Sequence, residues 1–376
     1  MVENRPSVSA MKNIGITGVD GLLGWHFRCY LKRYADINVI PAGRTTFSTD
    51  EQLNKFVSSS DVIVHLAGMN RGDDDELEKT NIILVENIIK ACKEQAHNPH
   101  IIFSSSTHCM RDTAYGRSKK EGARLFWEWA NRSGGLFTNL IIPNVFGEFG
   151  KPYYNSVVST FCYQLANGEQ PEVVNDIALE VVHAQQIATE IVSAINKKKE
   201  GDISTSGVPI NVSALLEKLT YFSAQYHSHI VPDLTKDIDI YLFNTFRSYL
   251  YPRYYPVSVN LHRDHRGELY EAVKSLNGGQ CFISTTKPGV TRGNHFHTKK
   301  FERFMVLKGN AVIRIRKLFS SEIVDFTVSG VNPCYIDIPT LHTHNIKNIG
   351  DSELITLFWA HEIFDSDNSD TISELV

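Results

Sequence analysis

At 376 residues the chain is longer than one ordinary domain, and with 42% hydrophobic and 21% charged residues it has the composition of a globular protein, not of a disordered or fibrous one. Its 42 acidic and 38 basic residues give a formal net charge of −4, so the overall charge does not favour nucleic acid or an anionic membrane as a partner. The six cysteines are scattered without a C-x-x-C pair, and no run approaches the roughly 20 apolar residues of a membrane span. We therefore predict a cytoplasmic protein of two domains with no nucleic-acid partner and no membrane insertion.

The first domain is predicted from a rhythm of short apolar runs and amphipathic stretches. Residues 1–10 have no apolar core and are expected to be a polar extension, because the first strand-like run, MKNIGITG, begins at Met11. The following stretches are LLGWHFRCYLKRY, NVIPAG, DVIVHLAG, TNIILVENIIKAC and HIIFSSS. Apolar strands that alternate with helices predict a parallel sheet covered on both faces, the doubly wound Rossmann-type α/β fold, here over residues 11–250.

A glycine-rich turn lies between the first predicted strand and the first predicted helix. Gly18, Gly21 and Gly24 form the pattern TGxxGxxG. Glycines at these positions let the backbone turn tightly and approach a pyrophosphate at the positive N-terminus of the helix. The same residues could form a turn without a ligand, but their place directly after the first strand favours a dinucleotide site.

The end of the second predicted strand indicates which dinucleotide is bound. An NAD site usually carries an acidic residue there for the ribose hydroxyls, whereas this sequence has Gly43 and Arg44. A guanidinium can pair bidentately with a 2′-phosphate, so NADP(H) is favoured over NAD. The alternative is that Arg44 is only a solvated surface charge.

Serine, tyrosine and lysine side chains follow the fourth predicted strand. Ser104, Ser105 and Ser106 end the run HIIFSSS, and Tyr115 and Lys119 lie four residues apart in the next helix. On one helical face the ammonium is expected to lower the pKa of the phenol from its ordinary value of about 10 and make it a usable acid. A serine opposite would hold the oxygen of a carbonyl that is being reduced.

This order of glycine turn, serine run and YxxxK resembles the extended short-chain dehydrogenase/reductase family, whose members mostly act on nucleotide sugars. The resemblance implies that Ser106, Tyr115 and Lys119 are catalytic, with Thr107 as the substitute for the serine. The cofactor-binding residues that it implies are Gly18, Gly21, Leu22, Gly24, Arg44, Leu66, Ala67, Gly68, Tyr115 and Lys119.

The same resemblance implies two substrate-binding residues further along the chain. Asn144, in the segment NVFG, matches a family segment that contacts cofactor and sugar, and Asn155 falls where the diphosphate of the nucleotide sugar is held. The sequence departs from the family pattern twice. Ile141 stands where an arginine is usual, and Ala184-Gln185-Gln186 replaces a common acidic pair.

A second, all-β domain is predicted over residues 251–376. After about Asn260 the sequence consists of short β-rich runs, among them QCFIST, RFMVLKG, NAVIRIRK and ELITLFWA, separated by Gly, Pro, Asn and Asp. Short β-rich runs separated by turn residues are typical of antiparallel sheets. The segment TFRSYLYPRYYPVSVN between the two predicted domains is too apolar for a free linker and is expected to pack along their interface.

Three histidines and a glutamate in this domain have metal-ligand spacing. His295 and His297, at i and i+2, share one face of a strand, Glu302 adds a carboxylate and His344 a further imidazole. The spacing resembles the two motifs of the cupin superfamily, which implies a double-stranded β-helix with a divalent metal. This mixed nitrogen and oxygen set suits Zn²⁺. Alternatively, the histidines are ordinary surface or core residues.

The second cupin motif is imperfect, because Leu341 stands at its usual glycine. A further resemblance leaves the role of His295 open. The segments DHRGELYE and RGNH resemble those of the dTDP-4-keto-6-deoxyhexose epimerases, cupins that work without a metal and use the histidine at the position of His295 as a base. That resemblance implies Arg266 and Arg292 as substrate-binding residues.

From Met11 onward the whole chain resembles bifunctional enzymes of capsule and O-antigen precursor synthesis, on strings such as HLAGMNR, GNHFHTKKFERFMVLKG and IPTLHTHNIKNIGD. The resemblance implies that the cupin epimerises C3 of a UDP-2-acetamido-2,6-dideoxy-4-hexulose. The reductase then uses NADPH at the C4 ketone to form UDP-2-acetamido-2,6-dideoxy-β-L-talose, on the way to UDP-N-acetyl-L-fucosamine. It also implies a homodimer.

Other readings remain open at the level of sequence. The cupin could be a metal-stabilised dimerisation module without catalysis, which only an assay separates from an epimerase. The first domain could be a UDP-sugar epimerase or dehydratase that recycles bound NAD. Arg44 argues against this function, because it stands where an NAD site usually has an acidic residue. A redox-sensing binding protein is disfavoured by the intact Ser106, Tyr115 and Lys119, and a cupin dioxygenase is weaker still.

Overall fold

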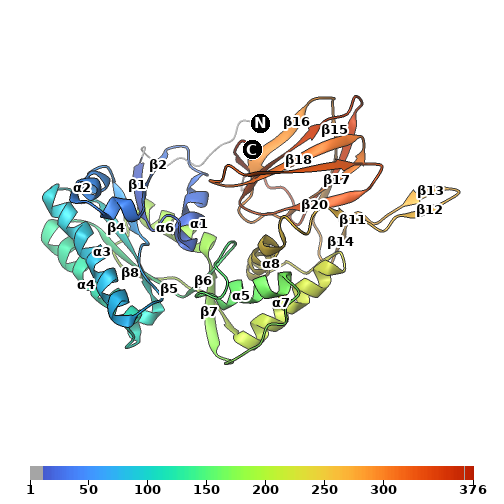
Figure 1. Cartoon of the computed structure of the whole chain (residues 1–376). Coiled ribbons are helices and arrows are strands. Elements are labelled where there is room, and N and C mark those ends of the chain that lie inside the picture. Colours follow the sequence, from blue (N-terminus) through green and yellow to red (C-terminus); the bar gives the residue numbers. More distant parts are fainter. Residues whose placement is uncertain (1–11, 368) are drawn as a thin grey trace. The chain divides into compact units, whose positions relative to one another are not determined.

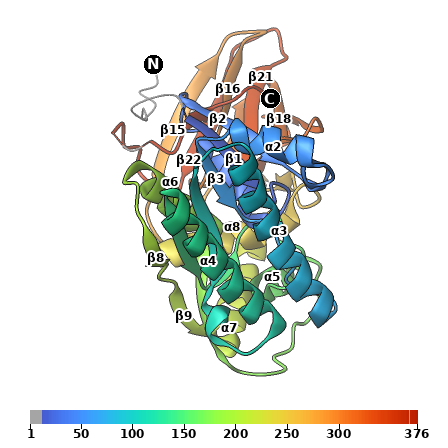
Figure 2. The same ribbon diagram turned by 90° about the vertical axis from the view of Figure 1, so that its left-hand side faces the viewer.

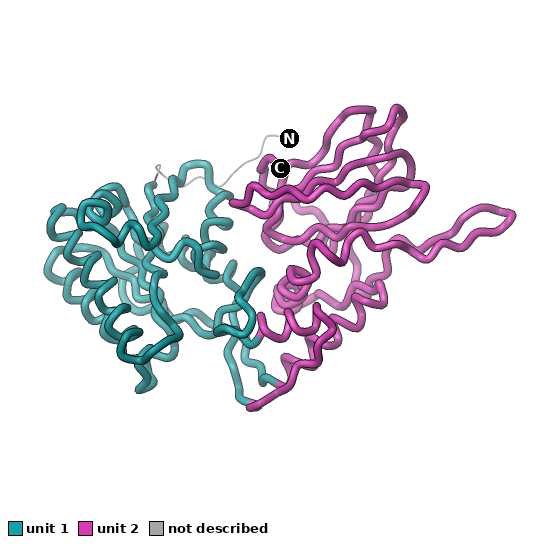
Figure 3. The backbone as a smooth tube through the Cα atoms, in the orientation of Figure 1, with its two compact units in different colours: residues 1–157, 177–212 teal, residues 158–176, 213–376 magenta. Residues whose placement is uncertain are grey.

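The computed structural model describes residues 12–367 and 369–376, so the predicted extension of residues 1–10 lies outside the described residues. Internal contacts divide the chain into two compact units (Figure 3). Unit 1 comprises the residues up to Val157 together with Ile177–Val212, and unit 2 comprises Val158–Asp176 and Ser213–Val376.

Unit 1 is built, among its described residues, on a six-stranded sheet in the order β2-β1-β3-β4-β5-β8, in which every neighbouring pair is parallel. The strands are β1 (Lys12–Thr17), β2 (Ile37–Ala42), β3 (Val62–His65), β4 (His100–Ser106), β5 (Phe137–Ile142) and β8 (Gly201–Ser204). The strand order reverses between β1 and β3, because the chain moves to one side of β1 and then to the other. In such sheets ligands bind at the carboxyl ends of the strands at this switch point.

Helices cover both faces of the sheet (Figures 1 and 2). On one face α1 and α6 pack against Ile14 and Ile16, and on the other α2, α3 and α4 pack against Ile63 and Ile101. The helical elements are α1 (Leu22–Leu31), α2 (Asp50–Ser58), α3 (Asp74–Glu94), α4 (Ala114–Ser133), α6 (Ala184–Asn196) and the 3₁₀ helices η1 (Arg44–Phe47) and η2 (Thr107–Met110). The prediction of a Rossmann-like parallel sheet between helices is confirmed.

A second, small sheet of unit 1 carries the segment around Asn144. It consists of β6 (Asn144–Phe146), β7 (Ala178–His183) and β9 (Val208–Asn211), with β7 in the centre. β6 runs parallel to β7, with Asn144 opposite Val181 and Phe146 opposite His183.

Unit 2 contains two five-stranded sheets among its described residues, in the orders β11-β20-β17-β22-β15 and β19-β18-β21-β16-β23. All neighbouring pairs within them are antiparallel, and residues of both sheets, such as Phe304 and Ile313, share one apolar core. The prediction of a mostly antiparallel C-terminal β domain is confirmed. The strands are β11 (Val257–Ser258), β15 (Gln280–Thr286), β16 (Thr291–Phe296), β17 (Glu302–Lys308), β18 (Asn310–Lys317), β19 (Ile323–Ser329), β20 (Cys334–Ile338), β21 (His342–Asn348), β22 (Leu354–Ala360) and β23 (Ile372–Ser373).

Helices α5 (Val157–Ala166), α7 (Val212–His227) and α8 (Asp237–Leu250) fall mainly or wholly in unit 2. Short strands complete it: β10 (Ile230–Val231) pairs with β14 (Lys274–Ser275), and β12 (His262–Asp264) pairs with β13 (Gly267–Leu269) in a separate hairpin.

Buried polar contacts join α7 and α8 to the strands of unit 2. Arg303 on β17 holds Asp337 on β20 at 2.7 and 2.9 Å, and the Tyr226 hydroxyl of α7 donates to the same carboxylate at 2.5 Å. Arg247 of α8 donates to the carbonyl of Ile338 at 3.0 Å. Residues 213–250 therefore group by contact with the C-terminal strands, while the functional boundary expected at residue 250 stays a prediction.

No helix in the described part of the chain combines the length and apolarity that crossing a bilayer requires.

Candidate functional site

The glycine-rich turn stands at the switch point of the parallel sheet. Gly18 has φ +69°, and a Cβ there would lie 2.8 Å from the backbone nitrogen of Ala67, whereas a Cβ at Gly24 would overlap the carbonyl oxygen of Gly18. Gly21 is the N-cap of α1, and no side chain among the described residues caps it. The N–H groups of the first turn, which begins at Leu22, thus face a close-packed cradle suited to an anion.

Thr17 ties this turn to the loop after β3. Its Oγ1 accepts hydrogen bonds from the backbone N–H groups of Leu66 and Ala67, both at 3.1 Å, and donates to Nδ1 of His65 at 2.8 Å. Burial, with a smaller contribution from Lys119, lowers the pKa of His65 to about 3, so its ring is neutral and can accept. Thr17 was not singled out in the sequence, although it precedes the first glycine of the motif.

Asn81 of α3 fixes the end of the same loop. Its side-chain oxygen accepts from the N–H of Met69 at 2.6 Å, and its amide donates to the carbonyl of Met69 at 2.8 Å and to Ser118 Oγ at 3.0 Å. A Cβ at Gly68 would lie 3.1 Å from this side-chain oxygen. The buried Asn81 joins the loop to α4, and its only signal in the sequence is an asparagine within an apolar helical stretch.

The three residues expected to be catalytic gather where β4 ends and α4 begins. Ser106 Oγ accepts from the backbone N–H of His108 at 3.2 Å, which leaves its own proton to donate. Lys119 donates from Nζ to the carbonyl of Ser104 at 2.7 Å, and Nζ lies 5.6 Å from the ring centroid of Tyr115. Thr107, the proposed substitute, is exposed at the start of η2.

Burial sets the protonation of this pair. It lowers the pKa of Lys119 to about 8 and raises the pKa of Tyr115 to about 12. The expectation that the ammonium lowers the pKa of the phenol is therefore wrong, because desolvation of the buried phenol raises that pKa. At neutral pH the phenol carries its proton, as a proton donor must.

Of the remaining residues expected in the first domain, Arg44 and Asn144 lie at or next to strand ends in unit 1, and Asn155 lies in the loop before α5. Arg44 is exposed at the start of η1, and it has no hydrogen-bond or ion-pair partner among residues 12–367 and 369–376. Asn144 opens β6 and donates to the carbonyl of Glu180 at 3.1 Å, and Asn155 donates to the carbonyl of Asn70 at 3.3 Å.

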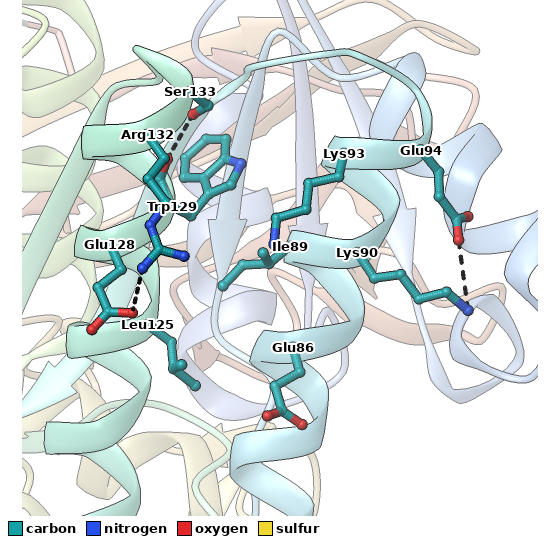
Figure 4. Close-up of a pocket in the computed structure, with 10 residues that line it drawn as sticks. All are labelled: Glu86, Ile89, Lys90, Lys93, Glu94, Leu125, Glu128, Trp129, Arg132 and Ser133. Atoms are coloured by element: carbon teal, nitrogen blue, oxygen red, sulfur yellow. Dashed lines mark hydrogen bonds and ion pairs between the residues drawn. The ribbon is translucent and has the colours of Figure 1, made fainter.

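A groove of about 690 Å³ on α3 and α4 lies apart from these residues (Figure 4). Charged side chains such as Lys93 and Arg132 line it, with Trp129 at its wall. None of the predicted site residues lines it.

In unit 2 the three histidines and Glu302 converge, with one ligand atom from each within 4.8 Å of the others. Glu302 Oε2 lies 3.0 Å from Nε2 of His297, 3.6 Å from Nε2 of His344 and 3.9 Å from Nε2 of His295. His295 pairs with His344 across β16 and β21, whereas Glu302 comes from β17 in the other large sheet. The four residues expected to be metal ligands are thus brought together.

The outer nitrogens of two of these histidines are already bonded. His297 donates from Nδ1 to the carbonyl of Asp370 at 2.6 Å, and His344 donates from Nδ1 to the carbonyl of His342 at 3.3 Å. Their Nε2 atoms are buried and accept no hydrogen bond from any described residue. Buried imidazole lone pairs that face a carboxylate, with the second nitrogen oriented by a carbonyl, fit a divalent cation.

The pKa shifts in this cluster bear on metal binding, because a metal binds the deprotonated forms of histidine and glutamate. Burial, reinforced by His295, lowers the pKa of His344 to about 3, and burial also lowers that of His295. Burial alone would raise the pKa of Glu302, but His297 and the other two imidazoles outweigh it and hold that pKa well below its ordinary value. The lowered pKa values of His295, His344 and Glu302 favour the deprotonated forms that bind metal.

Leu341 is the residue at which the sequence departs from the motif that it was predicted to resemble. It is fully buried and has φ +61°, the left-handed region that glycine favours. Its N–H donates to the carbonyl of His297 at 2.8 Å, so the unusual backbone connects directly to a metal-ligand candidate.

The two arginines expected to bind substrate are placed differently. Arg292 lies on β16 and donates to Thr286 Oγ1 at 3.0 Å and to the carbonyl of Thr285 at 2.9 Å. Arg266 lies in the hairpin β12–β13, paired with Asp264, and this hairpin projects away from the large sheets in Figure 1. The structure does not bring Arg266 to the histidine cluster of its own chain.

Comparisons with known proteins cover both units. Residues 14–211 match the NAD dependent epimerase/dehydratase family, and residues 262–372 match the polysaccharide biosynthesis C-terminal domain. A UDP-2-acetamido-2,6-beta-L-arabino-hexul-4-ose reductase from Pseudomonas aeruginosa is 28% identical over 362 residues, which are 95% of this chain and 96% of that protein.

Two solved structures extend the comparison. The capsular polysaccharide assembling protein CapF from Staphylococcus aureus is 31% identical with a TM-score of 0.63, over 97% of this chain and 100% of that one. A UDP-N-acetylglucosamine 4-epimerase from Bacillus cereus shares the fold at 20% identity and a TM-score of 0.52, over 57% of this chain and 82% of its own. Since the first match spans more than half of its length, the chain belongs to the NAD dependent epimerase/dehydratase family.

Proposed function

We propose that the chain is a bifunctional enzyme of a UDP-2-acetamido-2,6-dideoxy-4-hexulose. In this proposal residues 251–376 form a cupin that epimerises C3, and residues 11–250 reduce the C4 ketone with NADPH to UDP-2-acetamido-2,6-dideoxy-β-L-talose, a precursor of UDP-N-acetyl-L-fucosamine in capsule or O-antigen. The observation that carries the proposal is one chain with a Ser-Tyr-Lys arrangement in unit 1 and a histidine-glutamate cluster in unit 2. The similarity to the Pseudomonas aeruginosa reductase over both units supports it.

The chemistry of the substrate sets the order of the steps. A ketone at C4 acidifies the proton at C3, so a base can remove that proton and return it to the other face only while the ketone exists. Reduction then fixes the stereocentre. Two consecutive steps on one ketone give a reason for joining the two activities in a single chain.

In the reductase, the residues of unit 1 position and protonate the C4 oxygen. Ser106 Oγ would donate a hydrogen bond to this oxygen, and the protonated phenol of Tyr115 would transfer its proton to it. Lys119, held by the carbonyl of Ser104, would place its charge beside the phenol. NADPH supplies the hydride when bound, and the close-packed cradle of Gly18 and Gly24 fits its pyrophosphate.

For cofactor choice, the proposal assigns the 2′-phosphate of NADPH to Arg44. The guanidinium stands exposed directly after β2, and this end of the strand carries no carboxylate that would repel the phosphate. Turnover that consumes one NADPH for each product would exclude the rival reading of an enzyme that recycles NAD.

In the cupin, His295, His297, Glu302 and His344 would hold a divalent cation, and these ligand types suit Zn²⁺. A metal there would polarise a sugar oxygen or stabilise the fold. Arg292 would contact the substrate from β16.

A second candidate is a cupin whose metal is structural and whose role is dimerisation. Four protein ligands around one cation close its coordination, as in structural zinc sites, and this observation favours the alternative. The edge strand β15 also exposes Phe282 and Ile283, to 43% and 64%, which suits pairing with a second copy in a homodimer.

The deciding experiment is incubation of the purified enzyme with the UDP-4-keto sugar in deuterated water, with and without NADPH. The proposal predicts deuterium at C3 without NADPH, and one NADPH oxidised per C4 alcohol formed when it is present. Reduction with no exchange at C3 would favour the dimerisation module instead.

A further inference from the structure

A second cluster with metal-ligand composition lies in unit 1, apart from the catalytic residues. His26 of α1, Glu148 after β6 and His183 before α6 are fully buried, and one ligand atom from each lies within 4.8 Å of the others. His183 Nε2 lies 2.9 Å from Glu148 Oε2, and His26 Nε2 lies 3.9 Å from the same oxygen. Composition alone suggests a metal site, but the hydrogen bonds indicate another role.

The protonation of His183 follows from its place at the N-cap of α6. The ring Nδ1 of His183 accepts a hydrogen bond from the backbone N–H of Gln185 at 3.3 Å, and the backbone N–H of His183 donates to Gln186 Oε1 at 3.2 Å in a capping box. Because a backbone N–H only donates, the ring proton of neutral His183 is on Nε2 and points at Glu148. A metal at Nε2 would move that proton to Nδ1, opposite the N–H of Gln185, and would break the cap.

His26 is fixed in the same way. The side-chain amide of Gln185 donates to the carbonyl of His26 and to its Nδ1, both at 3.0 Å, so Nδ1 is an acceptor. The ring proton is then on Nε2, which donates to the carbonyl of Glu148 at 3.0 Å. These contacts place a proton on Nε2 of both histidines and occupy both Nδ1 atoms, so neither ring offers a lone pair to a cation.

The network of His26, Glu148, His183 and Gln185 packs against one end of the substrate segment, defined here as Asn144–Asn155. The parallel pairing of β6 and β7 puts Phe146 opposite His183. A Cβ at Gly147 would lie 2.9 Å from the His26 ring and 3.3 Å from His183 Nε2, so the segment packs directly on both rings. The network therefore joins the segment to α1, the helix that follows the glycine-rich turn.

The other end of the substrate segment is held by the loop after β3. Arg71 donates from Nη1 to the carbonyls of Tyr153 and Tyr154 at 2.9 and 3.0 Å. Asn155 donates to the carbonyl of Asn70. The substrate segment is therefore held by contacts within unit 1 at both of its ends.

We infer that His26, Glu148, His183 and Gln185 form a metal-free positioning network that holds the substrate segment in its binding conformation. The inference rests on the proposed function for the role of Asn144 and Asn155 toward the nucleotide sugar. In it, Gln185, which departs from the family's acidic pair, serves to orient His26.

The test compares three variants of the full-length protein. His183→Asn keeps an N-cap acceptor for α6 but is too short to reach Glu148. Glu148→Gln keeps an acceptor for His183 and is the conservative rescue. Gln186→Ala removes the other half of the capping box and is the control for α6 alone.

Binding of UDP to the NADPH-saturated protein is measured by calorimetry, with Asn155→Ala marking the reductase site, and zinc is counted per chain. We expect His183→Asn to weaken UDP about tenfold, because misplaced binding groups lose much of their effect, while NADPH binding changes less than about twofold. Glu148→Gln and Gln186→Ala should bind UDP nearly as wild type does. The zinc content should be the same in all three variants as in wild type.

Two results would overturn the inference: a zinc equivalent lost on His183→Asn, or unchanged UDP affinity in a folded His183→Asn protein. Wild type that fails to bind UDP at all would instead contradict the proposed function.

Discussion

Burial shifts the pKa values of Tyr115 and Lys119 in opposite directions, and both shifts bear on the catalytic roles proposed for these residues. The raised pKa of Tyr115 keeps its proton in place at neutral pH. The lowered pKa of Lys119, about 8, means that its charge is lost within the physiological to mildly alkaline range. At the residue scale, the reductase should therefore lose activity above about pH 8, as Lys119 is deprotonated.

For Tyr115→Phe we expect NADPH oxidation to fall by at least about a hundredfold, because the variant has no proton to give the C4 oxygen. The dissociation constant of NADPH should stay nearly unchanged, since the phenol meets the cofactor only at its edge. Steady-state kinetics and fluorescence titration measure the two quantities. Turnover within tenfold of wild type would contradict the assignment of Tyr115.

Replacement of Arg44 by alanine should separate the two cofactors. A charge-assisted bidentate pair with phosphate is worth enough that its loss weakens NADPH by about tenfold or more, whereas NADH has no 2′-phosphate to lose. The measurement is the ratio of the two dissociation constants in wild type and variant. Equal losses for both cofactors would show that Arg44 does not read the phosphate.

At the scale of elements, the strands of unit 1 bury neutral histidines at their ends. Burial lowers the pKa of His65 on β3 to about 3 and that of His100 on β4 to about 4. Because both values lie below the ordinary pKa of histidine, the unfolded chain binds more protons than the folded one between about pH 6.5 and pH 3 to 4. The contribution of these two histidines to the free energy of unfolding is therefore fully present above about pH 6.5 and is lost as the pH falls through this window.

We expect each of these histidines to cost on the order of 2 kcal/mol of unfolding free energy between pH 7 and pH 4.5. The unfolding transition of unit 1, recognised by its shift with NADPH, should move accordingly. His100→Gln keeps a polar partner for Thr138 and should show a smaller pH dependence than wild type. An identical pH dependence in the two proteins would show that His100 does not titrate in this window.

Leu341 shows how packing can override a local backbone preference. Glycine there would relieve the left-handed strain, about 1 kcal/mol, but would delete a fully buried side chain worth about 2 to 5 kcal/mol. Leu341→Gly should therefore be net destabilising, which chemical denaturation of unit 2 measures. A more stable variant would mean that burial of the Leu341 side chain stabilises the fold by less than the backbone strain costs.

At the scale of the whole molecule, the two proposed activities should separate. Replacing both His295 and Glu302 by alanine should remove the bound metal, because both are proposed ligands, and should suppress deuterium uptake at C3. Tyr115→Phe should retain that uptake without NADPH.

The ligand variant must first show a cooperative thermal transition, since metal loss also loosens a fold. A folded, metal-free variant that exchanges C3 at the wild-type rate would show that the metal takes no part in epimerisation.

Local patterns in the sequence were enough to predict the doubly wound sheet, the C-terminal antiparallel strands and the convergence of His295 and His297. These predictions succeed because each motif depends on residues that are close in sequence and share one turn, helix face or strand. This holds for the glycine triplet, the YxxxK pair and the two histidines at i and i+2. The position of the tyrosine and lysine relative to the serines follows from the same strand-to-helix connection.

Only the tertiary structure decided the features that depend on distant contacts. His26 lies 122 residues from its partner Glu148, and Asn81 contacts Ser118 on another helix. No periodicity of the sequence predicts either contact. Burial, which no spacing encodes, determined that the pKa of Tyr115 rises rather than falls. Likewise, α7 and α8 group with the C-terminal strands through the Tyr226–Asp337 and Arg247–Ile338 hydrogen bonds, which join residues that are 111 and 91 positions apart in the sequence.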